Sequence, residues 1–194
     1  MGENESEEDK RRSLLQIREN VENISDMLGA LISFAEPPLP KPLDTPVVQL
    51  IEEAVQLASY KSGHDDLDVA VQYAEADSVV YVDSAQIVSA LANVLVNSVE
   101  SYRGAVGPIQ VVVRANGPDY VDIVVKDQGC GMDEETLQRA TTPFFSAKPA
   151  GRQRGMGLAY AARVIQVNQG RLVLKSRLNQ GTEVKISLPT PEAI

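Results

Sequence analysis

The sequence is poor in cysteine, in positive charge and in long apolar runs. Its single cysteine, Cys130, excludes an intrachain disulfide and any zinc site built on cysteines. It has no signal peptide and no apolar run long enough to span a bilayer, so we expect a soluble, cytoplasmic protein. A net charge of -9 makes the chain a poor general binder of nucleic acid or anionic membrane, although a local basic cluster could still hold a phosphate.

The composition is that of a globular protein with one main core. Hydrophobic residues make up 43% and charged residues 23% of the 194 positions, which fits one domain with a helical appendage. Residues 1–10 are polar and acidic, and we predict that they are disordered. We assign residues 11–43 to the appendage and its linker, and residues 44–194 to the globular domain.

The appendage carries an apolar seam at helical spacing. Its residues alternate at intervals of three and four: Leu14, Ile17, Val21, Ile24, Leu28, Leu31 and Ala35. Such a heptad seam predicts a coiled-coil-like helix with a partner helix; the alternative is a helix that packs on its own domain. The helix must end near Glu36 because four prolines occur between residues 37 and 42, and this stretch predicts a stiff linker.

Beyond the linker, helical and strand patterns alternate, which indicates an α+β domain. We predict a helix near residues 47–58, with Asp44 or Thr45 as its cap, and a longer one to about residue 103 that begins after Asp83 or Ser84. Asp133 is predicted to cap a short helix, and a fourth helix ends near residue 167. Strands are predicted at 67–73, 79–82, 109–114, 120–126, 171–175 and 182–188.

Three groups of polar residues could form a nucleotide site. Asp127 follows an apolar strand and precedes Gly129 and Gly131; the acid could accept hydrogen bonds from an exocyclic amine, and the glycines would let a flat ring or a phosphate approach. The same pattern is also typical of an ordinary turn. Asn93 and Asn97 lie one helical turn apart, and their amide oxygens suit a Mg²⁺ ion that also holds phosphates; the alternative is two solvated amides.

The third group is a basic loop that leads into a helix. Lys148, Arg152 and Arg154 precede the helix start Gly155-Met156-Gly157-Leu158, an arrangement that favours anion binding at a helix N-terminus. The sole histidine, His64, falls in a predicted loop beside Gly63, where a solvated role is favoured over a catalytic one.

The order of these motifs resembles the ATP-binding catalytic domain of sensor histidine kinases, in the GHKL superfamily, over about residues 44–189. Asn93-Val94-Leu95-Val96-Asn97 resembles the N box, Asp127-Gln128-Gly129-Cys130-Gly131 the first glycine box, Thr142-Pro143-Phe144-Phe145-Ser146-Ala147-Lys148 the F box, Gly155-Met156-Gly157-Leu158 the second glycine box and Gly181-Thr182 the third. The F box form, with Glu100 after the N box, is most similar to the nitrogen-regulation branch.

The resemblance implies a two-layer α/β sandwich with helices on one face of a mixed sheet, and it implies ATP and Mg²⁺ as ligands. Asp127 would accept the adenine amino group, Thr182 would support the base through water, and Gly129 and Gly131 would lie against base and sugar. Asn97 would be the main Mg²⁺ ligand. The phosphate end would comprise Asn93, Lys148 and the helix start Gly155, Met156, Gly157 and Leu158.

The resemblance extends to the N-terminal helix. Residues 28–37 are similar to the end of the second dimerisation and phosphotransfer helix, which in the family joins a four-helix bundle of two subunits. No phosphoacceptor histidine lies in this segment. We therefore expect the chain to be part of a longer protein that donates the γ-phosphoryl group to a histidine supplied elsewhere, with a response regulator as the later partner and a possible homodimer through this helix.

The sequence departs from the family pattern at Gln153, where the second glycine box usually begins with glycine. Its neighbours Arg152 and Arg154 could contact the terminal phosphate. The motifs allow three alternative functions: an ATP-hydrolysing switch of the gyrase, mismatch-repair and chaperone type, a protein-serine kinase of the same superfamily, and a dimerisation module with a vestigial pocket. The switch proteins carry a water-activating Glu where this chain has Asn93, which cannot take a proton.

Overall fold

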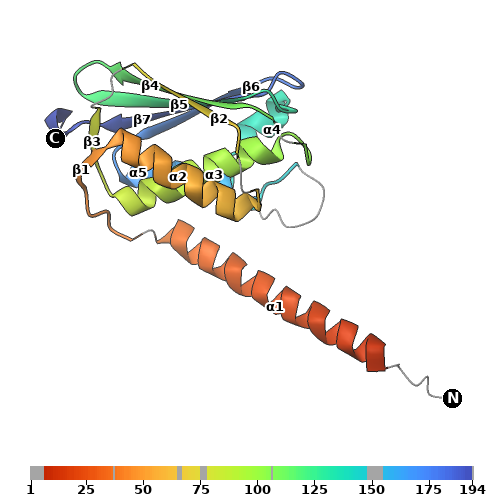
Figure 1. Cartoon of the computed structure of the whole chain (residues 1–194). Helices are drawn as coiled ribbons and strands as arrows, with labels where there is room; N and C mark the ends of the chain where they lie inside the picture. Colours follow the sequence, from red (N-terminus) through yellow and green to blue (C-terminus); the bar gives the residue numbers. More distant parts are fainter. Residues whose placement is uncertain are drawn as a thin grey trace.

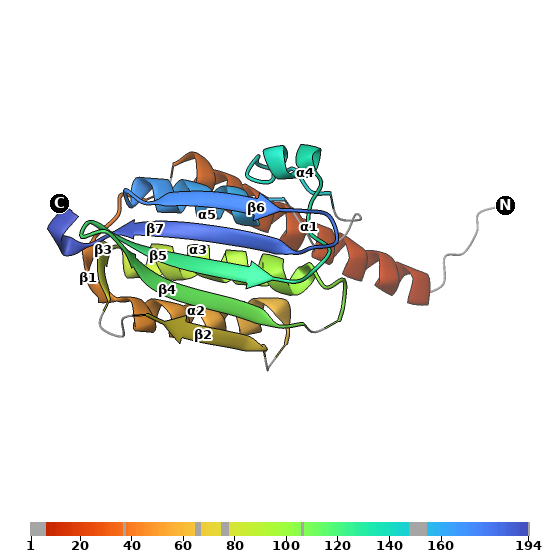
Figure 2. The same cartoon turned by 90° about the horizontal axis from the view of Figure 1, so that it is seen from above.

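The computed structural model describes residues 7–36, 38–64, 67–74, 78–105, 107–147 and 155–193. Its main domain has two layers, a mixed sheet and a layer of helices on one face (Figures 1 and 2). The sheet has the order β2 (Val69–Tyr73), β4 (Ile109–Asn116), β5 (Tyr120–Asp127), β7 (Thr182–Pro189), β6 (Arg171–Ser176). The covering helices are α2 (Val47–Ser62), α3 (Ser84–Glu100) and α5 (Gly157–Val167). The remaining elements are α1 (Glu7–Ala35), β1 (Leu43–Pro46), β3 (Val79–Val82), α4 (Glu134–Arg139) and the 3₁₀ turn η1 (Pro191–Ala193).

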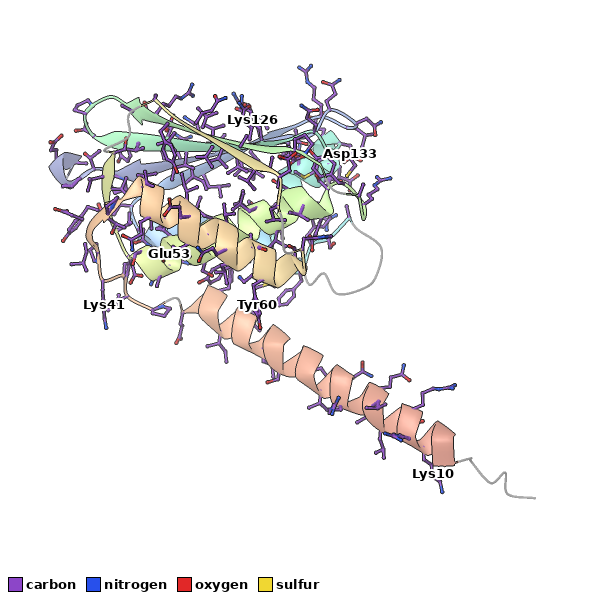
Figure 3. All side chains as sticks on the ribbon, viewed as in Figure 1. Lys10, Lys41, Glu53, Tyr60, Lys126 and Asp133 are labelled. Carbon is purple, nitrogen blue, oxygen red and sulfur yellow. The ribbon has the colours of Figure 1, made fainter. Side chains whose placement is uncertain are left out.

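The central strand β5 positions the site. It pairs antiparallel with β4 and β7, while β2 pairs parallel with β4. Because side chains alternate across a strand, Val121, Ile123 and Val125 point into the core against the helices, and Lys126 projects from the opposite face (Figure 3). Asp127, the last residue of β5, stands opposite Thr182 of β7.

Helix α3 lies between α2 and α5 and is the most deeply buried helix of the layer (Figure 2). The residues that α3 buries include Ile87, Leu91, Val94, Leu95 and Ser98. Asp83 caps the helix as predicted, because its Oδ1 accepts a hydrogen bond from the Gln86 N–H at 3.1 Å. The helix ends at Glu100, a few residues earlier than predicted.

The predicted cap of α2 was wrong. Asp44 and Thr45 belong to β1, which pairs with β3, and the residue before the helix is Pro46, which makes no side-chain capping bond. The Val47 N–H instead donates to the carbonyl of Ser78 at 2.9 Å. A backbone carbonyl next to β3 thus takes the place of a side-chain cap for the first N–H of the helix.

Helix α1 projects away from the two-layer domain (Figure 1) and contacts α5. It includes residues 7–10, for which the prediction of disorder was wrong; residues 1–6 lie outside the described part of the chain. Its apolar seam is exposed on this single chain, with Leu14 at 66% and Ile24 at 57% exposure. In the described part of the chain, no helix is both long and apolar enough to cross a membrane.

Candidate functional site

Asp127 is an almost fully buried carboxylate at the end of β5. It is 6% exposed, and its Oδ1 accepts hydrogen bonds from the N–H groups of Gly129 at 3.0 Å and Thr182 at 3.2 Å. The hydroxyl of Ser101 lies 3.1 Å from the same oxygen and shares its proton with the Ser98 carbonyl. Among the described residues, Oδ2 receives no hydrogen bond. The carboxylate therefore keeps acceptor capacity for a donor from outside the chain.

Gly129 and Gly131 lie so close to neighbouring parts of the chain that a side chain at either position would clash. A Cβ atom at Gly129 would lie 1.8 Å from Ser101 Oγ. Gly131 has φ +61°, and a Cβ atom there would lie 2.0 Å from the carbonyl oxygen of Arg177. These close contacts hold the turn against the end of α3 on one side and the β6–β7 turn on the other. The expected approach of the two glycines to base and sugar stays a prediction.

Thr182 ties the first residue of β7 into the same network. It is 6% exposed, and its hydroxyl lies 3.0 Å from Ser176 Oγ, which accepts a hydrogen bond from the Met132 N–H at 2.9 Å. A cleft of about 580 Å³ opens at this end of the sheet. Asp127 and Thr182 contribute to its wall, together with Leu137, Leu174, Lys175 and Arg177. Asn93 and Asn97 do not line this cleft.

One edge of α3 leads from Asp127 towards the start of α5. Ser101, Asn97 and Asn93 follow at intervals of four residues and so lie on the same side of the helix. Ser101 contacts Asp127, while the Cβ atom of Asn93 lies 3.8 Å from the position a Cβ would take on Gly157. The structure thus brings both asparagines and the glycine start of α5 onto one path that begins at Asp127.

The first turn of α5 has backbone donors without an acceptor among the described residues. Its first main-chain bond runs from the Tyr160 N–H to the carbonyl of Met156 at 2.8 Å, and Met156 supplies no side-chain cap. Within the described residues, the N–H groups of 157–159 have no acceptor, and such a helix start favours an anion. Met156 is buried, and Leu158 packs half-buried against the core.

Gly155, just before α5, packs closely against the backbone of Phe144 and Phe145. Gly155 has φ +63°, and a Cβ atom there would lie 2.5 Å from the carbonyl oxygen of Phe145. Phe145 is covered by the Arg139 guanidinium, 4.1 Å from the ring centroid, and Phe144 adopts φ +63°. The predicted phosphate contacts Lys148, Arg152 and Arg154 lie outside the described residues.

Sequence reasoning missed one residue that the structure places at the site. Lys61, in the last turn of α2, donates from Nζ to Asn93 Oδ1 at 3.2 Å. A lysine in this position is common because it complements the helix dipole, so the sequence held no signal for it. In the described part of the chain, no cluster of three or more His, Cys, Asp or Glu side chains could hold a metal ion.

The motif region matches a known protein family. Residues 82–192 match the model described as the histidine kinase-, DNA gyrase B- and HSP90-like ATPase. The chain belongs to this ATPase family. The match extends from the end of β3 to η1, and it includes α3, the Asp127 turn, the start of α5 and Thr182.

Individual proteins named as kinases are also similar in sequence to this chain. The chain is 25% identical over 173 residues to sporulation kinase E of Bacillus subtilis (strain 168), a match that covers 89% of this chain and 23% of that protein. It is 33% identical over 144 residues to the methanogenesis regulatory histidine kinase FilI of Methanothrix harundinacea (strain 6Ac), covering 74% and 16% respectively. The chain therefore spans less than a quarter of the length of either relative.

A solved structure confirms the fold. The nucleotide-free catalytic domain of histidine kinase ThkA superposes with a TM-score of 0.67 at 24% identity, and the match covers 79% of this chain and 99% of that one. The two-layer α+β sandwich predicted from the sequence is therefore the fold of a histidine kinase catalytic domain.

Proposed function

We propose that the chain is the ATP-binding catalytic part of a sensor histidine kinase, which binds MgATP and donates the γ-phosphoryl group to a histidine on another segment. The observation that carries the proposal is Asp127, a buried carboxylate whose Oδ1 receives three hydrogen bonds, while its Oδ2 receives none from the residues that the structure describes. A carboxylate in this state suits the amino group of adenine. Thr182 lies beside it and would support the base through water.

The phosphate end is proposed for the edge of α3 that faces α5. Asn97 is the proposed Mg²⁺ ligand, because the oxygen of Asn93 already faces the Lys61 ammonium, which would repel a second cation. Amide oxygens are suitable ligands for Mg²⁺ that also holds phosphates, where it would neutralise their charge during transfer. The N–H groups at the start of α5 and Asn93 would orient the phosphates.

The acceptor and the partners are proposed from the relatives. The chain's one histidine, His64, follows α2 and does not lie on α1, the helix that resembles the dimerisation and phosphotransfer helix. The acceptor histidine would thus come from another segment or protein, and a response regulator would receive the phosphoryl group next. The match to sporulation kinase E covers 173 of the 194 residues, so it extends into α1 whichever end it leaves out. This supports α1 as a dimerisation helix with its exposed seam against a second copy.

A direct phosphotransfer experiment tests this proposal. The chain is mixed with MgATP labelled at the γ position and a separate histidine-bearing dimerisation fragment of a sensor kinase. We expect acid-labile, base-stable label on the fragment, and we expect Asn97→Ala to reduce the label at least about a hundredfold because transition-state charge would lose its stabilisation. Lys41→Ala, at an exposed residue of the linker, is the matched control and should transfer normally.

The alternatives predict other products. Acid-stable label would favour a protein-serine kinase, and free phosphate without transfer would favour an ATP-hydrolysing switch. Wild-type transfer by Asn97→Ala would contradict the proposed metal ligand.

A further inference from the structure

Lys61 reaches from α2 across to α3 and has an unusual partner. Its ammonium donates to a neutral amide oxygen, Asn93 Oδ1, at a sequence separation of 32 residues. Among the described residues this is its only polar partner, and no carboxylate lies within ion-pair distance. Other lysines of the domain are paired with acids: Lys126 and Lys175 lie beside Glu183, and Lys185 lies beside Asp122.

Lys61 is an exposed residue whose ammonium is desolvated only in part by the surrounding protein. This desolvation lowers the pKa of Lys61 below its usual value. An amide dipole compensates a desolvated cation only in part, because it carries no charge. The hydrogen bond with Asn93 holds the ammonium beside α3, where an anion can reach it from solvent.

A second source of positive potential lies on the other side of Asn93. At Gly157, the first residue of α5, an added Cβ atom would lie 3.8 Å from the Cβ atom of Asn93. The N–H groups of 157–159 have no acceptor among the described residues, and they carry the positive end of the α5 dipole. A cation from α2 and a helix start from α5 thus converge on one position of α3.

This position lies far from the adenine end of the site. Ser101 contacts Asp127, and Asn93 lies two turns earlier on the same edge of α3, roughly 12 Å away at 1.5 Å per residue. Asn97, the proposed Mg²⁺ ligand, lies between them. An anion beside Asn93 would therefore be the part of the nucleotide most distant from the base.

We propose that Lys61 binds the terminal phosphate of ATP, with Asn93 holding its ammonium towards the start of α5. The inference rests on the proposed function and adds to it a specificity for triphosphate over diphosphate. In this arrangement Lys61 and the metal at Asn97 neutralise the phosphate chain from two positions. The loss of Lys61 should therefore lower the affinity for MgATP and leave the affinity for MgADP almost unchanged.

The test is nucleotide affinity, measured by isothermal titration calorimetry with MgATP and MgADP on the complete chain. Lys61→Met retains the length of the side chain and removes its charge. We expect it to weaken MgATP binding about tenfold, the usual worth of one charge-assisted hydrogen bond, and to change MgADP binding less than about twofold. Lys61→Arg should recover most of the MgATP affinity. Lys41→Met removes the same charge at an exposed linker residue and should leave both affinities unchanged.

Four results would overturn the inference. Unchanged MgATP affinity in Lys61→Met, with normal binding by wild type, would remove Lys61 from the site and leave the proposed function intact. Equal losses of affinity for MgATP and MgADP would show that Lys61 does not contact the terminal phosphate. An equal loss of affinity in Lys41→Met would show that the effect arises from the net charge of the chain. Absence of MgATP binding by the wild-type chain would overturn the proposed function and this inference together.

Discussion

Strand β5 carries two buried aspartates on opposite faces of the sheet, and the chain binds them in different ways. Asp122, 3% exposed, accepts hydrogen bonds at Oδ1 from Ser187 Oγ at 2.6 Å and Asn116 Nδ2 at 3.0 Å. Its Oδ2 faces the cations Lys185 at 3.5 Å and Arg114 at 3.8 Å. Asp127 has no such cation within ion-pair distance among the described residues, and all its donors meet at Oδ1.

The difference distinguishes a structural acid from the acid that we propose binds the nucleotide. Both oxygens and the charge of Asp122 are satisfied by neighbouring strands, so this residue stabilises the open face of the sheet. Asp127 is held firmly through one oxygen while the other stays available. Burial alone would have placed the two residues in one class, whereas the distribution of their partners separates them.

The largest expected effect concerns the turn that holds Asp127. Gly131 and Gly117 both have positive φ, at +61° and +72°, but a Cβ atom at Gly117 meets nothing within 4 Å. We expect Gly117→Ala to cost about 1 kcal/mol of unfolding free energy from backbone strain alone, and Gly131→Ala about 3 kcal/mol because the contact with Arg177 adds overpacking. Urea denaturation measures both. Equal losses would show that the turn at Asp127 is no more constrained than an open hairpin.

The next effect contrasts the two acids directly. Asp127→Asn keeps the shape and one acceptor oxygen but replaces the available oxygen by an NH₂ donor. We expect MgATP affinity to fall about thirtyfold, or about 2 kcal/mol, with less than about 1 kcal/mol lost from folding stability. Asp122→Asn should do the reverse, with unchanged MgATP affinity and about 1–2 kcal/mol lost from stability.

Titration calorimetry and urea denaturation on the two variants check this contrast. The predicted contrast would be wrong if Asp122→Asn also weakened MgATP binding, because the open face of the sheet would then contribute to the site. It would also be wrong if Asp127→Asn bound MgATP with the affinity of the wild type.

Local signals in the sequence predicted much of this fold. Asp83 and Asp133 were predicted as caps because a cap depends on residues three positions away, and both carboxylates accept the expected backbone hydrogen bonds. β1 was missed because only its pairing with β3 defines it, and Pro46 argued against a strand.

Some residues of the candidate site were predicted from the sequence, and others were not. Asp127 and its glycines were found because they are adjacent in sequence, and the structure supplies the hydrogen bonds that join them to Ser101 and Thr182. Lys61 could not be found, because its contact depends on how α2 packs against α3. Asp122 was overlooked because it lies within an apolar run, and its partners Asn116 and Ser187 come from neighbouring strands.

The smallest expected effect is the pH dependence of stability at Asp122. Burial would raise the pKa of this carboxyl, but hydrogen bonds from Ser187 and Asn116 and the charge of Lys185 together outweigh it and lower the pKa. A lowered folded pKa means that folding favours the carboxylate. Its contribution is therefore present above the unfolded value of about 4 and is lost as the pH falls through the folded pKa.

Urea denaturation of wild type and Asp122→Asn from pH 7 to pH 3 measures this contribution. The stability difference between the two proteins should hold constant down to about pH 5 and then shrink as Asp122 takes up its proton. Glu183, whose pKa is lowered chiefly by its hydrogen bond with Lys126, is present in both proteins and cancels in the difference. Stability curves that stay parallel down to pH 3 would show that Asp122 acts through hydrogen-bond geometry alone, and the charge of Lys185 would then add nothing to the contrast with Asp127.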